Sequence, residues 1–426
     1  RLHRSPYAER VPGGADLVTY WFEKARAHIE AGKCQRAGLV ATQSIRKGSN
    51  QKVLARICES TLIFNAWSDE EWINEGAAVR VSLVCFSSLS QRGRVEGGGI
   101  TLNGAPVTTI HADLSAGEGL NLTQAKPLEE NAGVAFQGPV KVGSFDIEGE
   151  LARQWLKLPN PNGRPNSDVL RPWANGQDLT GRPSDTWIID FGADRAEQEA
   201  ALYETPFAQV VREVKPQRDA QNDAGRKAKW WLHGRSGADM RAALAPLKRY
   251  IATPRVAKHR MFVWLDVSVL SDSRLYAIAR EDDATFGILS SRIHEVWALA
   301  NASMHGVGND PTYNAKSCFE TFPFPEGLTP LSPAVPIDHE CDFVTPLPSS
   351  RGVSRKLLIW MATVSSVAQA TRPLNELRNN WLNPPEWTDW VRTAEEEKAG
   401  YPLRPVAKAG HEADLKKRTL TNLYNQ

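Results

Sequence analysis

Apolar residues near the start of the chain recur at helical spacing. Between residues 17 and 25 they return every three or four positions, which predicts a helix with Asp16 as its N-cap and Gly32 as its end. Residues 53–57 repeat this spacing and predict a second helix. Two helices therefore lie within the first sixty positions.

Short apolar runs separate these helices. Residues 37–42, 61–66 and 78–86 predict strands, and we expect the run at 37–42 to be a buried parallel strand. Helices that alternate with strands favour an α/β layer fold for residues 1–90.

Later patterns predict further units. Residues 187–191 predict a strand, residues 260–270 and 274–280 two strands joined by a short turn, and residues 286–300 one helix. The expected organisation is an α/β unit over 1–90, a connector over 91–130, an α+β unit over 131–325, a proline-rich linker over 326–355 and a helical region over 356–426.

Composition narrows the class of protein. The 426 residues suggest about three domains, and 41% hydrophobic with 23% charged residues exclude a disordered chain. The chain has 51 basic and 49 acidic residues, so its net charge is too small to bind nucleic acid through bulk charge alone. Basic residues that are concentrated on one face can still bind nucleic acid.

The cysteines and the apolar runs indicate the cellular compartment in which the protein is expected. The five cysteines form no CxxC pair, so we expect no zinc site of the ribbon type, and their wide spacing suggests free thiols in a reducing cytoplasm. No apolar run approaches the ~20 residues of a membrane span, so we expect no membrane partner. The chain begins with Arg1, and we expect it to be part of a longer protein.

Basic charge concentrates in one stretch. Residues 212–260 hold thirteen Lys or Arg and four acids, with Trp230, Trp231 and Tyr250 interleaved. This composition is typical of a surface that follows phosphates, and the alternative is a solvated helix face. If residues 255–260 are extended, Lys258 and Arg260 point the same way.

Several long segments in a fixed order resemble one family. They resemble the MmeI-like adenine-specific DNA methyltransferases, which are single-chain modification and restriction-modification enzymes. The segments of residues 11–25, 38–57 and 64–86 resemble the end of the family's catalytic domain. Four further segments resemble the family's target recognition domain, namely residues 160–192, 248–265, 280–297 and 318–325. Residues 418–426 resemble its C-terminal helical region.

The resemblance implies a chemistry. Such enzymes flip an adenine out of double-stranded DNA and transfer a methyl group to it from S-adenosyl-L-methionine. The family's glycine-bearing cofactor loop and its Asn-Pro-Pro-aromatic catalytic loop precede the segment that Asp16 opens here, and neither occurs in this sequence. We therefore assign no catalytic residue and expect this chain alone to lack methyl transfer.

The resemblance also implies site residues. Asp16 and Leu17 would lie on the cofactor side, with a helix cap as the alternative. Trp72 would lie near the flipped base, with a core or loop tryptophan as the alternative. The basic stretch and the resemblance together give these candidates for DNA contact: Arg171, Lys248, Arg249, Arg255, Lys258, His259, Arg260, Tyr313, Asn314 and Lys316.

Two further motifs have residues in common with catalytic or metal sites but are interpreted as structural. Asn383-Pro384-Pro385 has the core of the catalytic loop, but Glu386 follows in place of an aromatic residue, so we interpret it as a turn at a helix boundary. Asp282 and Asp283 are interpreted as turn residues, and we predict no metal site and identify no nuclease signature.

Three functions remain open. The first is part of a DNA adenine methyltransferase that supplies target recognition and half of the catalytic fold. The second is a DNA-binding specificity module without catalysis of its own, completed by another chain. The third is an α/β protein that binds RNA.

Overall fold

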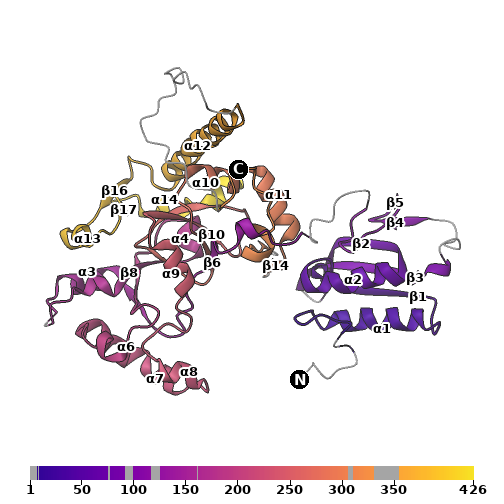
Figure 1. Cartoon of the computed structure of the whole chain (residues 1–426), viewed down its shortest axis with the longest axis horizontal. Coiled ribbons are helices and arrows are strands. Elements are labelled where there is room, and N and C mark those ends of the chain that lie inside the picture. Colours follow the sequence, from indigo (N-terminus) through magenta and orange to yellow (C-terminus); the bar gives the residue numbers. More distant parts are fainter. Residues whose placement is uncertain are drawn as a thin grey trace. The chain divides into compact units, whose positions relative to one another are not determined.

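A computed structural model describes residues 7, 9–74, 77–91, 99–116, 125–160, 162–305, 310–330 and 355–426. The chain forms two compact units, labelled by element in Figure 1. Unit 1 comprises Arg1–Lys126 and Leu299–Thr312, and unit 2 comprises Pro127–Ala298 and Tyr313–Gln426.

Unit 1 is built on a five-stranded sheet of order β1-β3-β2-β4-β5. Its elements are α1 (Val18–Glu30), β1 (Arg36–Thr42), the 3-10 turn Gln43–Arg46, α2 (Gly48–Ser60), β2 (Thr61–Asn74), β3 (Ala77–Ser88), the 3-10 turn Leu89–Gln91, β4 (Ile100–Leu102), β5 (Ala105–Val107), β14 (Met304–His305) and β15 (Asp310–Pro311). The predicted helices and strands of residues 17–86 are thus confirmed.

The apolar faces of both helices pack on the sheet of unit 1. Phe22 of α1 stacks on Phe86 of β3, with ring centroids 6.4 Å apart, and Leu54 of α2 is fully buried in the same cluster. The predicted end of α1 is also confirmed, because Gly32 adopts a φ of 68° that side chains with a Cβ rarely take.

Strand β1 differs from its prediction. It pairs only with β3 among the described residues, and that pairing is antiparallel, so residues 37–42 form an edge strand in place of a buried parallel one. Val40 is 45% exposed as a result. Ala37, Leu39 and Ala41 pack in the core cluster of unit 1, and Val40 lines a surface pocket described below.

Part of the predicted connector belongs to the sheet of unit 1. Strands β4 and β5 form a hairpin around Asn103 and Gly104, whose φ values of 52° and 77° suit the tight turns that join antiparallel strands. Strand β4 also pairs in parallel with β2. Residues 92–98 and 117–124 of that predicted connector lie outside the described residues.

Unit 2 contains two four-stranded sheets, of order β11-β10-β13-β6 and β12-β8-β9-β7. Their strands are β6 (Ala135–Gln137), β7 (Asp146–Glu148), β8 (Leu170–Ala174), β9 (Thr186–Ile189), β10 (Arg249–Pro254), β11 (Val263–Asp266), β12 (Leu270–Ser271) and β13 (Leu275–Ile278). The helices between them are α3 (Gly149–Lys157), α4 (Gly176–Thr180), α5 (Glu197–Ala200), α6 (Glu204–Glu213), α7 (Lys215–Asp219), α8 (Ala224–Ala228) and α9 (Ala238–Leu244).

Two predictions within unit 2 are wrong in detail. The expected pair of strands at residues 260–280 is separated, because β10 lies between β11 and β13 and pairs with both. The expected single helix is two, α10 (Asp283–Leu289) and α11 (Arg292–Asn301). Asp282 caps α10 by accepting a hydrogen bond from the Thr285 amide, and Asp283 is the first residue of that helix. The predicted turn is therefore wrong, and the acidic pair marks the start of a helix instead.

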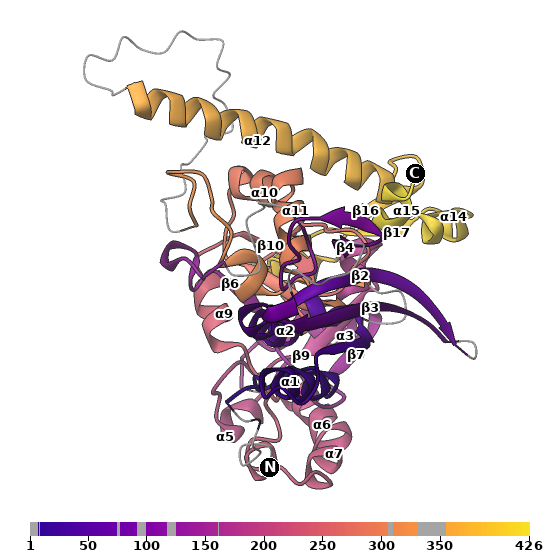
Figure 2. The same ribbon diagram turned by 90° about the vertical axis from the view of Figure 1, so that its right-hand side faces the viewer.

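The C-terminal region is not purely helical, contrary to prediction. The strands β16 (Thr388–Val391) and β17 (Arg404–Ala407) form an antiparallel hairpin among helices. The helices are the long α12 (Arg355–Leu382), prominent in Figure 2, then α13 (Ala394–Lys398), α14 (Glu412–Lys417) and α15 (Leu420–Tyr424). Residues 331–354 of the predicted linker lie outside the described residues.

Helix α12 packs closely on α10. A Cβ at Gly287 would lie 2.3 Å from the Thr371 hydroxyl and 2.7 Å from a methyl of Val367, so only glycine permits this approach. Helix α12 ends at Leu382, directly before Asn383, which confirms that Asn-Pro-Pro marks a helix boundary.

Candidate functional site

A surface pocket of unit 1 brings together residues that are distant in the sequence. It lies where the start of α1, the edge strand β1 and the hairpin of β2 and β3 meet. Its lining residues are Asp16, Val18, Val40, Ala41, Thr42, Trp72, Val79 and Val81. The pocket thus joins the predicted cofactor residue Asp16 to the predicted base-pocket residue Trp72.

Asp16 is held in place by neighbouring polar groups. Its backbone amide donates to Asn50 Oδ1 at 2.8 Å, and Asn50 Nδ2 donates to Asp16 Oδ2 at 2.8 Å. Ser44 Oγ adds a bond to Oδ2 at 3.1 Å. The alternative of a helix cap is wrong, because Leu17 occupies the N-cap position and provides no side-chain hydrogen bond.

The other two residues predicted for the cofactor and base sites, Leu17 and Trp72, are open to solvent, but only Trp72 lines this pocket. Leu17 is 76% exposed and Trp72 is 43% exposed. Trp72 pairs with Val79 across the hairpin, and both side chains line the pocket. The alternative of a buried core tryptophan at position 72 is therefore wrong.

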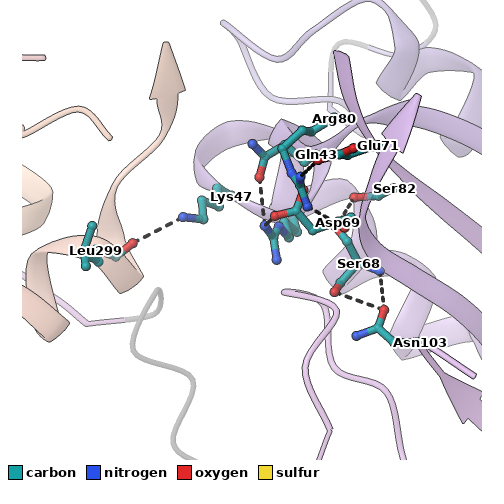
Figure 3. Close-up of polar contacts among 10 residues, drawn as sticks. Gln43, Lys47, Ser68, Asp69, Glu71, Arg80, Ser82, Asn103 and Leu299 are labelled. Atoms are coloured by element: carbon teal, nitrogen blue, oxygen red, sulfur yellow. Dashed lines mark hydrogen bonds and ion pairs between the residues drawn. The ribbon is translucent and has the colours of Figure 1, made fainter. Parts of the chain in front are cut away.

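Figure 3 shows a polar network around Ser68 and Asp69 of β2. Strand β2 carries a bulge between Trp67 and Glu70, and Asp69 within it accepts hydrogen bonds from Arg46 at 3.0 Å and Arg80 at 2.5 Å. The hydrogen bond that Arg80 donates to Asp69 and the negative charge of Asp69 raise the pKa of Arg80. Bulges often redirect side chains next to functional sites.

The backbone of this bulge is also satisfied. Asn103 Oδ1 accepts a hydrogen bond from the Ser68 amide at 2.8 Å, and Ser82 Oγ donates to the Ser68 carbonyl at 2.7 Å. Within the same unit, Lys47 Nζ donates to the carbonyl of Leu299 at 3.2 Å (Figure 3). The two bonds at Ser68 tie the bulge of β2 to Ser82 of β3 and to Asn103 between β4 and β5.

Two residues predicted to contact DNA lie in the core of unit 2. Arg260 is 9% exposed and donates to Thr253 Oγ1 at 3.0 Å and to the Pro254 carbonyl. Tyr313 is 1% exposed and its hydroxyl bonds His294 Nε2 at 2.9 Å. Burial lowers the pKa of Arg260 and raises that of Tyr313. Both predictions of DNA contact are contradicted in this structure, because neither side chain reaches the surface.

The predicted extended arrangement of residues 255–260 is also wrong. Strand β10 ends at Pro254, and Lys258 is exposed while Arg260 is buried, so the two do not point the same way.

Three other candidates for DNA contact are engaged within unit 2. Arg249 lies 3.8 Å above the ring of Trp264 and pairs with Asp283 at 2.8 Å. Arg255 donates to the carbonyl of Ser273 at 3.1 Å, and His259 bonds Asn425 at 2.9 Å. Among the remaining candidates, Arg171 is half-buried, and the exposed residues are Lys248, Lys258, Asn314 and Lys316.

The basic stretch of residues 212–260 also contains both arginines that are buried or paired and basic residues that are exposed. Arg241 makes two hydrogen bonds to Asp190, at 2.7 and 2.9 Å. Burial alone would raise the pKa of Asp190, but Arg241 and the nearby His233 lower it to about 2. Arg218 is fully buried, whereas Lys227, Lys229 and Arg235 are exposed.

A metal site is not found in the described part of the chain. No group of three or more His, Cys, Asp or Glu residues there could hold a metal ion. Every helix in the part of the chain that the structure describes is also too short or too polar to cross a membrane.

The comparisons with known proteins bear on the fold. No family model and no curated protein matches the sequence. The structure is similar to that of the Type IIL restriction-modification enzyme MmeI in complex with DNA, with a TM-score of 0.58 and 18% identity. That alignment covers 85% of this chain and 51% of the other.

A second solved structure aligns more weakly. The type IIG restriction endonuclease BpuSI aligns with 82% of this chain and 43% of its own, at 7% identity and a TM-score of 0.28. The chain therefore shares the α/β fold of the MmeI structure and spans about half of its length.

Proposed function

We propose that this chain is part of a site-specific DNA adenine N6-methyltransferase of the restriction-modification type. The observation that carries the proposal is the fold, which is shared over 85% of the chain with a restriction-modification enzyme whose structure was solved with DNA. In this proposal unit 2 recognises the DNA target and unit 1 supplies half of the catalytic fold.

The pocket of unit 1 fits one side of a site for S-adenosylmethionine and a flipped base. Asp16 Oδ2 accepts both side-chain bonds described above, and among the described residues Oδ1 accepts none, so Oδ1 is left to accept a hydrogen bond from a ligand. Trp72 offers an exposed aromatic face, on which stacking stabilises a base by about 1–3 kcal/mol. Bound S-adenosylmethionine would supply the methyl group, while Asp16 and Trp72 would orient the ligands.

The edge of the sheet supports a further part of the catalytic fold. An open edge strand with exposed apolar side chains invites another strand, and β1 exposes Val40 next to the pocket. We propose that a segment of the same protein, or a complementing chain, pairs with β1 and contributes the cofactor loop and the catalytic loop.

Unit 2 would contact double-stranded DNA through its exposed residues. Lys248, Lys258 and Lys316 would neutralise phosphates, and Asn314 has an amide that can bond a base edge. Asn314 Oδ1 also caps the turn at Lys316, which fixes its orientation.

The test is methyl transfer by the complete protein. Purified protein is incubated with radiolabelled S-adenosylmethionine and duplex DNA, and the DNA is digested to nucleosides. The proposal predicts labelled N6-methyladenine in one sequence context. Sequence-specific binding without transfer would favour the specificity module without catalysis, and the absence of both would contradict the proposal.

A further inference from the structure

A polar groove in unit 2 lies over a buried cation. The groove is lined by residues of α8, by the segment that precedes α9, and by Arg218 of α7. Its basic lining residues are Arg218, Arg226, Lys229 and Arg235, and its acidic ones are Asp223 and Asp239. A volume of about 620 Å³ lies within the usual range of ligand sites.

Arg218 lacks a counter-ion. Its side chain is 0% exposed, and Nη2 donates to the carbonyls of Lys141 at 3.0 Å and Leu232 at 2.9 Å. Nε and Nη1 are buried and have no hydrogen-bond partner, and no carboxylate in the described structure forms an ion pair with this guanidinium. The guanidinium carbon also lies 5.9 Å from the centroid of the Phe145 ring. A buried charge without a counter-ion is costly, so it favours an anion nearby.

The cations at the surface of the groove complete the site. Arg226 pairs with Asp223 at 3.3 Å, which neutralises that acid. Lys229 and Arg235 are exposed and, across the residues that the structure describes, form no side-chain ion pair. Two cations without ion-pair partners thus line the same groove as the buried Arg218, against one acid, Asp239, that is also without an ion pair in the described structure.

We propose that this groove holds a phosphate group, namely a backbone phosphate of the bound duplex. This assignment rests on the proposed DNA recognition by unit 2, and it adds a phosphate-positioning site outside the residues predicted from the sequence. Lys229 and Arg235 contact the phosphate oxygens, and the Arg218 charge raises the local potential without touching the ligand. Phosphate contacts of this kind fix the register of a protein on DNA.

The experiment compares two double variants of the full chain with the same change of charge. The groove variant is Lys229→Glu with Arg235→Glu. The control is Arg212→Glu with Lys227→Glu, because these exposed residues belong to the same basic stretch but do not line the groove. Affinity for a fluorescent duplex is measured at several salt concentrations, and the thermal midpoint is measured with inorganic phosphate or chloride at equal ionic strength.

The proposal predicts a specific loss in the groove variant. Its affinity for duplex should fall at least about 10-fold further than that of the control, and the dependence of log K on log salt should become shallower by about 1–2 units. Inorganic phosphate should raise the thermal midpoint of the wild type and the control, but not of the groove variant.

Other outcomes overturn parts of the inference separately. Equal behaviour of both variants in both assays would overturn the phosphate site. A second outcome is that the groove variant loses the phosphate response and yet binds DNA as tightly as the control does. That result would show that the groove takes a free phosphate, which overturns the DNA assignment. A phosphate response without any duplex binding would overturn the proposed function and leave the phosphate site standing.

Discussion

The guanidinium of Arg260 lies over the ring of Tyr313, with its carbon 4.9 Å from the ring centroid. Both residues were expected in the DNA interface, and they instead stabilise each other in the core of unit 2. The same contact links the loop between β10 and β11 to the segment that follows β15.

Replacing Arg260 should therefore destabilise the protein. Arg260→Ala removes bonds to Thr253 and the Pro254 carbonyl and leaves buried acceptors unsatisfied, so we expect a loss of about 2–3 kcal/mol in the free energy of unfolding. Lys258→Ala, at an exposed position in the same loop, should change it by less than about 0.5 kcal/mol. Urea unfolding measures both, and an Arg260 variant of wild-type stability with weakened DNA binding would contradict this role.

Acid should weaken unit 2 through His294. Burial, with a smaller contribution from Arg260, lowers the pKa of His294 to about 3, against about 6.5 in an unfolded chain. The unfolded state therefore binds a proton first, so this stability is fully present above about pH 6.5 and is lost as the pH falls toward 3. The slope for one proton is at most about 1.4 kcal/mol per pH unit.

The variant His294→Gln isolates this effect. Glutamine can still bond the Tyr313 hydroxyl but does not titrate, so urea unfolding between pH 7 and pH 4 should show a shallower pH dependence. His233, whose pKa burial also lowers, should retain its own share of the slope. Parallel profiles for the variant and the wild type would show that His294 does not remain neutral in the folded state.

Arg241 should matter for folding more than for DNA binding. Its removal leaves Asp190 buried without its partner, which costs about 3–5 kcal/mol of unfolding free energy. Lys227→Ala, in the same basic stretch but exposed, should be close to neutral. Thermal or urea unfolding of Arg241→Ala tests this prediction. A variant as stable as the wild type would show that the pair of Arg241 and Asp190 does not stabilise unit 2.

Trp72 should affect catalysis in the complete protein without affecting its fold. Loss of base stacking costs about 1–3 kcal/mol, or roughly 5- to 150-fold in kcat/KM for methyl transfer. Trp21→Ala is the matched control, because Trp21 is 61% exposed but does not line the pocket. Equal kinetics for the two variants would exclude Trp72 from the base site.

Local patterns predict the elements of this protein better than their pairing. The helices around Phe22 and Leu54 follow from apolar spacing, because that spacing is set by the helix itself. The position of β10 between β11 and β13 depends on contacts between distant residues, which no local pattern encodes. The apolar run of β1 indicates a strand but does not indicate which edge it occupies.

The candidate site is predictable to the extent that a resemblance supplies it. Asp16 and Trp72 were assigned to one site on that ground, and the structure brings them into one pocket. Charge counting locates the basic stretch but cannot separate a buried arginine such as Arg218 from an exposed one such as Arg235, because burial is decided by packing. No signal in the sequence marks Arg218 as a residue without a counter-ion.

The most direct measurement is the competition between duplex DNA and RNA of the same sequence for the full chain at matched salt. A protein that binds DNA in the major groove loses this surface in RNA, whose major groove is too narrow for side chains. We predict clear preference for duplex DNA, with an affinity that falls steeply as salt rises. Equal affinity for RNA, or no binding to duplex at low salt, would contradict DNA recognition by unit 2.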